Sequence, residues 1–246
     1  MISKPAATAV IVSGLILLTG GCGKRNDVIQ GGADTLYERA TRSMENGNYR
    51  NSIAYFEQLE ARYPFSNVTK QAQLDLIFVY YKNGALEQTV DAADNFMREN
   101  PTHPRVDYCL YMKGLSYFDK GGNILEKMFR VDMTTRPPRD TQKSFNAFQE
   151  LLRRFPDSEY SPDARKRMVY LRNRLAVYEN HVAEFYIRRK AYVAAINRAK
   201  FAVENYPGAP TINESVKIMA EAYRRLGMED LAADAERVYK NSSPGT

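Results

Sequence analysis

The fold is decided by the stretch Gly47-Asn-Tyr-Arg-Asn-Ser-Ile-Ala-Tyr-Phe-Glu-Gln-Leu-Glu-Ala-Arg-Tyr-Pro64. Its glycine suits a turn, because glycine adopts backbone conformations that other residues avoid. Small and apolar residues then recur at helical spacing. Proline closes the stretch, since it lacks an amide hydrogen and clashes with the preceding helical turn. The stretch therefore predicts one helix held between two turns.

The same frame occurs four more times, at 84–101, 139–156, 190–207 and 227–244, always with a proline at its end. The frames at Arg139 and Lys190 begin without glycine and rest on the apolar spacing and the proline. This pattern resembles the second half of a tetratricopeptide repeat, in which a helix A and a helix B pack as a pair. With no alternating strand pattern, we predict an all-α, superhelical array of about five such pairs.

The spacing of the terminal prolines locates two departures from a regular array. Two of the intervals are 37 residues, whereas those ending at Pro156 and Pro207 are longer. The first excess predicts an insertion at 122–138, which is too apolar for an idle linker. It is either a binding element or a cap over a groove. The second excess predicts an unusually long helix, from about Pro162 to Ile187, with Ser161 as its N-cap.

The N-terminus predicts an exported, lipid-anchored protein. Residues 1–21 carry one charge and a short apolar run, as in a cleaved signal peptide. The following Cys22 resembles the modified cysteine of a bacterial lipobox, which carries a diacylglycerol and an N-acyl chain. Two or more acyl chains anchor a domain stably. We expect 22–33 to be a lipidated tether on the periplasmic face of the outer membrane, and Cys109 to be a buried thiol.

Little in the sequence favours catalysis. The two histidines, His103 and His181, cannot form a histidine-rich metal site, and no nucleotide-binding loop or nucleophile elbow is present. We therefore expect no enzymatic activity, no metal and no cofactor beyond the lipid. The net charge of +6 fits several kinds of partner. Nucleic acid is not among those we expect for an exported protein without a nucleic-acid motif.

Tetratricopeptide arrays usually bind extended peptides or helices along the face made by their A helices. Aromatic side chains suit this role, because they bury a large area with few rotors to freeze. The alternative is that most of them pack between helices. The candidate groove and rim residues are Tyr37, Tyr63, Phe65, Leu74, Phe78, Tyr81, Lys82, Arg105, Tyr108, Tyr111 and Phe118.

The positive charge is concentrated in residues 150–200, which contain 12 Lys/Arg residues and 6 Asp/Glu residues. Three interpretations are open for this stretch: a solvated helix face, a docking site for an acidic protein, or a site for lipid headgroups.

Three further motifs stand out: Arg62-Tyr-Pro-Phe65, Leu74-Asp-Leu-Ile77 with Tyr80-Tyr-Lys-Asn83, and Asn100-Pro-Thr-His-Pro104 with Asp107-Tyr108. Together with the lipobox and the repeats, these motifs resemble the BamD (ComL-like) lipoprotein family.

The resemblance implies a non-enzymatic scaffold in the β-barrel assembly machine. Repeats 1–3, residues 34–156, would bind targeting segments of unfolded outer-membrane β-barrel proteins. Repeats 4–5, residues 157–246, would dock onto a POTRA domain of BamA, with BamC-like and BamE-like lipoproteins as further partners. The docking candidates are Arg188, Arg189 and Arg198. The alternative function is another periplasmic tetratricopeptide scaffold that regulates cell-wall enzymes.

Overall fold

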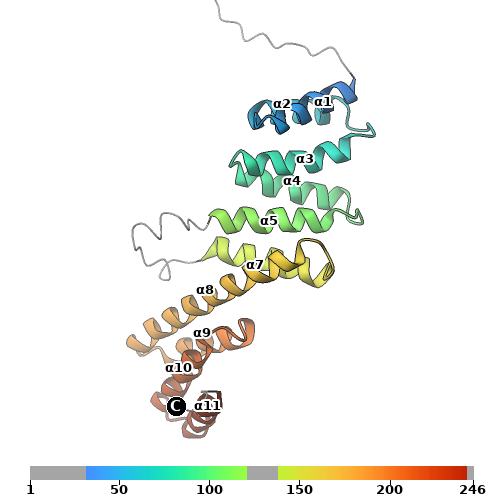
Figure 1. The fold of residues 1–246 in the computed structure, drawn as a ribbon. Helices are drawn as coiled ribbons and strands as arrows, with labels where there is room; N and C mark the ends of the chain where they lie inside the picture. Colours follow the sequence, from blue (N-terminus) through green and yellow to red (C-terminus); the bar gives the residue numbers. More distant parts are fainter. Residues whose placement is uncertain (1–31, 121–137, 243–246) are drawn as a thin grey trace, which may run out of the picture. The chain divides into compact units, whose positions relative to one another are not determined.

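The computed structural model describes residues 32–120 and 138–242, but not the side chains of Asp119 and Lys120. This part of the chain folds entirely into helices and turns (Figure 1). The ten helices are α1 (Ala33–Glu45), α2 (Tyr49–Arg62), α3 (Thr69–Lys82), α4 (Leu86–Glu99), α5 (Val106–Lys120), α7 (Arg139–Arg154), α8 (Ser161–Arg188), α9 (Tyr192–Asn205), α10 (Ile212–Arg225) and α11 (Glu229–Ser242). They form the five predicted pairs, so the all-α repeat class is confirmed.

The sequence frame sets the boundaries of the B helices. All five end two residues before the proline of their frame. Four begin two residues after the first frame position, and that position has a positive φ in each: 71° at Gly47, 76° at Gly84, 60° at Lys190 and 74° at Gly227. Lys190 thus adopts a left-handed conformation that glycine would adopt without strain. The exception is α7, which begins at Arg139 itself.

Small residues let the two helices of a pair approach closely. In the first pair, the Ser52 hydroxyl of α2 donates to the Ala40 carbonyl of α1 at 2.9 Å. In the third pair, the Ser144 hydroxyl of α7 donates to the Gly114 carbonyl of α5 at 2.8 Å. All four residues are buried. Each hydroxyl is satisfied by the neighbouring helix, so burying it carries little penalty.

Gly114 is the tightest of these contacts. A Cβ atom built on it would lie 2.5 Å from the Phe148 ring of α7, which is itself fully buried. The corresponding A-helix positions in the later pairs are Ala183 and Ala220, both buried. The third pair requires a glycine because the Phe148 ring lies directly against this position, whereas the first pair has Ala40 there although its B helix carries Phe56.

The long helix predicted around 162–187 is α8, which runs from Ser161 to Arg188. The predicted N-cap was wrong. Ser161 is the first helical residue, and its hydroxyl donates to the Phe155 carbonyl at 2.8 Å, across the turn from α7. Tyr160 is the N-cap residue and its side chain makes no capping bond. Ser161 thus joins two elements and does not cap its own helix.

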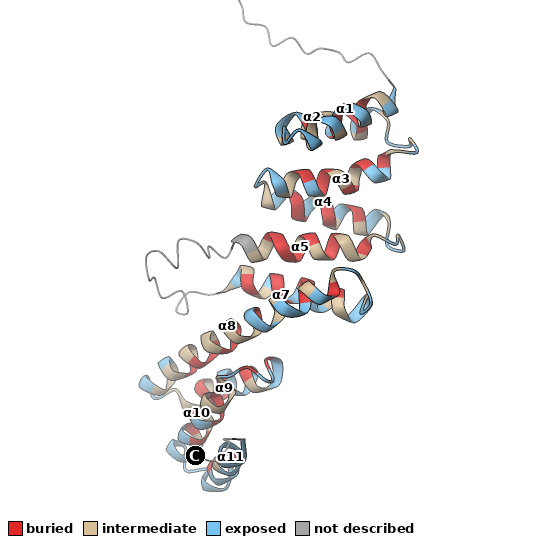
Figure 2. Ribbon diagram, viewed as in Figure 1, coloured by how far each residue is buried: buried red, intermediate tan, exposed pale blue. Residues whose placement is uncertain are grey.

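The first half of α8 packs on α7, and its second half packs on α9 and α10 (Figure 1). Leu171, Leu175 and Ala176 belong to the large cluster that also contains Phe148. Tyr206, at the end of α9, reaches back to α7, where its hydroxyl donates to Gln142 at 2.7 Å. Buried residues line the contacts between successive helices (Figure 2). The core is therefore continuous from α3 to the end of α9.

Candidate functional site: an aromatic face on the A helices

The first part of the site joins α1 to α3. The Tyr37 hydroxyl donates to Asp75 Oδ2 at 2.8 Å, and the Gln71 side-chain amide donates to Asp75 Oδ1 at 2.8 Å. Burial raises the pKa of Asp75, against these two hydrogen bonds. Burial, and then the neighbouring carboxylate, raise the pKa of Tyr37 to about 12. Asp75 also lies near Tyr108 of α5, so this pair leads to the next A helix.

The second part is centred on Arg105, in the turn before α5. Its guanidinium donates to Glu159 Oε1 at 2.9 Å and to the Tyr160 hydroxyl at 2.8 Å. The same guanidinium carbon lies 5.1 Å from the centre of the Tyr108 ring and 5.7 Å from that of Tyr160. Arginine is suited to this position, because its planar group can stack on rings while its edge makes hydrogen bonds.

The third part joins α5 to α8. The Tyr111 ring stacks on that of Tyr160, with centroids 4.6 Å apart and planes inclined by 19°. The Tyr111 hydroxyl donates to Asp163 Oδ2 at 2.9 Å, and Arg167 Nε donates to the same oxygen at 2.6 Å. Desolvation favours protonation of Asp163, but the bonds from Arg167 and Tyr111 outweigh it and lower the pKa.

Further along the same two helices, aromatic rings continue the row. The Phe118 ring lies 5.7 Å from that of Tyr170, and the Arg167 guanidinium lies 4.8 Å from the Phe118 centroid. On α3, Phe78 is 37% exposed, and Lys82 Nζ lies 6.0 Å from its ring centre.

We call this row the aromatic face. It consists of Tyr37, Asp75, Phe78, Arg105, Tyr108, Tyr111, Phe118, Tyr160, Asp163, Arg167 and Tyr170. Where a helix contributes several members, they stand three, four or seven residues apart, as one helix face requires. Ring surfaces alternate with carboxylates and guanidinium groups along it. Such a surface can bury apolar side chains and also form hydrogen bonds with a peptide backbone.

Three predicted groove residues lie elsewhere. Leu74 is 5% exposed and belongs to the core, so its assignment to the groove was wrong. Leu74 directly precedes Asp75 on the helix, and the neighbour faces the site in its place. Phe65 is 97% exposed and, with Lys70 and Glu99, lines a separate hollow between two inter-repeat turns. Tyr63 belongs to the same turn as Phe65.

Two further candidates occupy intermediate positions. Tyr81 is half-buried and packs against the core, and so do Tyr108, Tyr111 and Phe118, as the alternative interpretation of these aromatic residues expected. Lys82 is exposed beside Phe78.

Sequence reasoning missed the polar members of the face. Asp75 is a carboxylate within the apolar run Leu74–Val79, which could have signalled a special role. Asp163 and Arg167 are spaced four residues apart in the predicted long helix, as an ion pair on one helix face would be. Tyr160 gave no signal, because it lies outside the repeat pattern and meets Tyr111 only through the fold.

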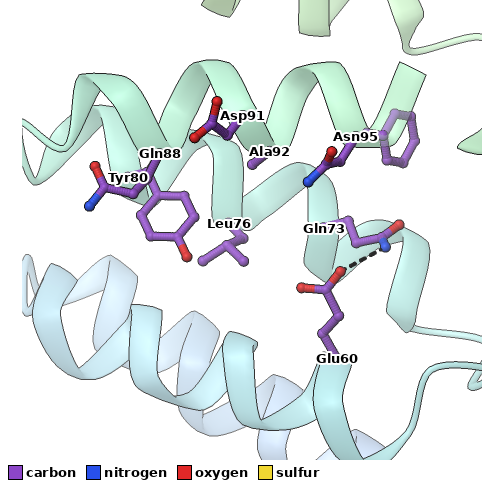
Figure 3. Close-up of a pocket in the computed structure, with 9 residues that line it drawn as sticks. Glu60, Gln73, Leu76, Tyr80, Gln88, Asp91, Ala92 and Asn95 are labelled. Atoms are coloured by element: carbon purple, nitrogen blue, oxygen red, sulfur yellow. Dashed lines mark hydrogen bonds between the residues drawn. The ribbon is translucent and has the colours of Figure 1, made fainter. Parts of the chain in front are cut away.

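A polar pocket of about 190 Å³ lies on the opposite side of α3, against α2 and α4 (Figure 3). Among its lining residues, Glu60 accepts a hydrogen bond from the Gln73 amide at 3.0 Å. Leu76, Tyr80 and Asp91 also line it. Because Gln73 and Tyr80 face away from Asp75 around the helix, this pocket is not part of the aromatic face.

The basic residues of the C-terminal helices have local partners. Arg188 lies 3.9 Å from Glu184, and the Arg189 guanidinium lies 5.0 Å from the Phe185 ring centre. Arg198 Nη1 lies 3.3 Å from Glu179 Oε2. All three arginines are exposed. Their role in docking stays a prediction.

Two other predictions concern residues outside the described part of the chain, namely the lipidation of Cys22 and the insertion at 122–138, of which only Pro138 is described. Among the helices that are described, none combines the length and the apolar character needed to cross a membrane. Cys109 is buried as expected, and burial raises the pKa of its thiol to about 12.

Comparison with known proteins identifies the family. A family model described as "Outer membrane lipoprotein" (YfiO) matches residues 30–238. The outer membrane protein assembly factor BamD of Vibrio cholerae is 39% identical over 222 residues, covering 89% of this chain and 92% of the relative. BamD of Neisseria meningitidis serogroup A is 37% identical, covering 86% and 79%. BamD of Xylella fastidiosa (strain Temecula1) is 35% identical, covering 96% and 81%.

Among solved structures, a tetratricopeptide repeat protein from Parabacteroides merdae aligns with 86% of this chain and 80% of its own, at 12% identity and a TM-score of 0.40. The repeat assignment rests on the helix pairs themselves. The family model and the relatives cover most of the sequence that forms the aromatic face. The chain therefore belongs to the YfiO family of outer membrane lipoproteins, which includes the BamD assembly factors.

Proposed function

We propose that the chain is a lipid-anchored scaffold of the β-barrel assembly machine, and that its aromatic face binds extended segments of unfolded outer-membrane proteins. The name of the relatives, outer membrane protein assembly factor, supports the general role. The observation that carries the specific role is the continuous row of rings, carboxylates and arginines across α1, α3, α5 and α8. The face holds no feature that requires a covalent step, so capture of a segment is the chemistry that it fits.

A peptide-binding measurement tests the face. The full chain in detergent is titrated with a labelled peptide that matches the C-terminal strand of an outer-membrane β-barrel protein. Fully burying a phenylalanine contributes roughly 1.5–3 kcal/mol, and a ligand can bury only the exposed 37% of Phe78, so we expect Phe78→Ala to raise the Kd about 3- to 6-fold. The matched control is Phe201→Ala on α9, since Phe201 is 42% exposed but lies outside the face. Equal Kd values for the two variants would contradict the proposal.

We further propose that the C-terminal helices dock onto a POTRA domain of BamA through Arg188, Arg189 and Arg198. The exposed position of these arginines supports this role, because acidic partners steer toward such residues and pair with them. The test measures binding of the full chain to the periplasmic domains of the matching BamA. We expect Arg189→Ala to weaken binding, and Arg153→Ala, an exposed arginine on α7, to leave it unchanged. The reverse pattern would place docking on another surface.

The anchor is proposed to be a lipid on Cys22, and the location the periplasmic face of the outer membrane. The lipobox-like sequence before Cys22 supports it. Acyl chains contribute about 0.8 kcal/mol per buried methylene, so their loss should release the protein. We expect Cys22→Ser to move the exported chain from the membrane fraction to the soluble periplasmic fraction. Retention of this variant in the outer membrane would refute a lipid anchor at Cys22.

A further inference from the structure

Glu179 is a buried carboxylate in the second half of α8. The residue is 7% exposed, and its neighbours along the same face, Ala176 and Ala183, are fully buried. Carboxylates are rarely buried without a partner, because they lose their hydration. Burial accordingly raises the pKa of Glu179, while Arg198 acts in the opposite direction. The position therefore needs an explanation that packing alone does not supply.

The partner of Glu179 is Arg198, on the next helix. Arg198 Nη1 lies 3.3 Å from Glu179 Oε2, and the arginine side chain is 46% exposed, against 9% for the glutamate. The pair thus spans from the interior to the surface of the α8–α9 contact. A guanidinium has five N–H donors, and this contact uses one of its nitrogens. The exposed part of the group retains donors for a ligand in solution.

We propose that Glu179 is a positioning residue, which fixes the Arg198 guanidinium from behind so that its exposed donors meet a carboxylate of the docking partner. This inference rests on the proposed docking function. Arginine has a large rotamer entropy, which is lost when the side chain is held at an interface. If Glu179 already holds the side chain in the free protein, less entropy is lost on binding, so the complex is tighter.

A competing effect has the opposite sign. Glu179 also neutralises part of the arginine charge, which would weaken the attraction to an acidic partner. Glu179 is held within the α8–α9 contact, whereas a carboxylate on the surface would be mobile and would restrain the guanidinium less. We therefore expect the positioning effect of Glu179 to be larger than its neutralising effect. The two effects differ in kinetics. Loss of positioning raises the dissociation rate, whereas loss of neutralisation raises the association rate.

Reversal of the charge at Arg198 is an ambiguous test of docking. It would leave Glu179 buried without its partner and bring a second carboxylate beside it, which destabilises the fold. The neutral pair Glu179→Gln/Arg198→Gln leaves no unpaired buried charge, because two glutamine side chains are uncharged and can hydrogen-bond to each other.

The experiment is a double-mutant cycle on binding to the periplasmic domains of BamA, with the full chain in detergent. The variants are Glu179→Gln, Arg198→Gln and the double variant. We expect Glu179→Gln to raise the Kd about 5- to 20-fold through faster dissociation, and Arg198→Gln to raise it further. The double variant should bind like Arg198→Gln, because there is then no guanidinium to position. If Glu179 had only a structural role, Glu179→Gln would still raise the Kd when residue 198 is already glutamine.

Glu184→Gln is the matched control. It removes a carboxylate from the same helix that also faces an arginine, Arg188, but both side chains of that pair are exposed. We expect its Kd to be unchanged. Peptide binding at the aromatic face, measured on every variant, shows that the repeats remain folded.

The outcomes separate the two proposals. If Arg198→Gln weakens binding but Glu179→Gln does not, or tightens it, the positioning role is overturned and docking through Arg198 stands. If the Kd of the double variant rises by the product of the two single fold-changes, Glu179 acts independently of Arg198 and the inference again fails. If Arg198→Gln binds like the wild type, docking through Arg198 fails, and if the wild type does not bind, the whole docking proposal fails; in both cases the inference falls with it.

Discussion

The N-terminal repeats, α1–α7, and the C-terminal repeats, α8–α11, solve the same packing problem with side chains of different size. At the tenth frame position the first and third B helices carry Phe56 and Phe148, whereas α4 and α9 carry Ala93 and Ala199, and all four residues are fully buried. The C-terminal helices bury mainly alanines against one another, among them Ala183 and Ala202. Similar helix pairs can therefore be built around a core of large aromatic side chains or around a core of alanines.

The outer surfaces show the complementary difference. Of the twelve large apolar side chains that are exposed in the described residues, ten lie in or after α8. The N-terminal repeats place their apolar bulk inside, and the C-terminal repeats leave much of it outside. Large contiguous apolar patches mark surfaces that meet a partner, whereas single exposed apolar residues are common on any protein. The two halves therefore differ in where their large apolar side chains lie: mainly inside in the N-terminal repeats, and more often at the surface in the C-terminal repeats.

The largest expected effect is on the aromatic core. Phe148→Ala should destabilise the fold by about 3–5 kcal/mol, because it removes transfer energy and leaves a cavity. At the same frame position, Ala199→Gly should cost only about 1 kcal/mol, the difference in helix propensity. Denaturant unfolding followed by circular dichroism measures both. Equal losses would mean that the two halves do not differ in how their cores stabilise them.

The next effect concerns the glycine that the aromatic core requires. Gly114→Ala should destabilise the fold by about 1–3 kcal/mol through overpacking, since its Cβ would lie 2.5 Å from the Phe148 ring. The double variant Gly114→Ala/Phe148→Leu should recover part of that loss. Helix propensity alone predicts the opposite sign, a gain of about 1 kcal/mol. A higher melting temperature for Gly114→Ala would therefore refute the close packing.

A smaller effect is expected at the aromatic face. Tyr37→Phe should cost about 1 kcal/mol at neutral pH, because it removes the hydrogen bond to Asp75. The pKa of Tyr37 is about 12 in the fold, against about 10 when unfolded. Its contribution is therefore complete below pH 10 and is lost as the pH rises toward 12. Urea unfolding at pH 7 and pH 11 should show a smaller alkaline loss for Tyr37→Phe than for the wild type.

The smallest effect is a gain, in the C-terminal repeats. Lys190 has a φ of 60° at a position where Gly47 and Gly84 stand in the N-terminal repeats. Lys190→Gly should stabilise the fold by up to about 1 kcal/mol by relieving this conformation. Lys190→Ala, which keeps the unfavourable conformation, is the control and should give no gain. If both variants behave alike, the left-handed backbone at residue 190 carries no strain.

Much of the fold could be predicted, because the information is local. The glycine turns, the apolar spacing and the closing prolines placed all five B helices and the long α8. The failures arose where a residue bonds to something outside its own helix. Ser161 looked like an N-cap, but its hydroxyl reaches the Phe155 carbonyl. Leu74 and Asp75 are adjacent, and which of them faces the groove depends on the rotation of α3 against its neighbours.

The sequence by itself determined the repeat array, the ends of the B helices and the family, since these depend on spacing along one chain and on motifs within it. Only the tertiary structure decided the site. Tyr160 meets Tyr111, Asp75 meets Tyr37, and Glu179 meets Arg198 through the packing of separate helices. The physical reason is that a helix fixes which residues share its face, whereas the partner of that face is set by the neighbouring helix.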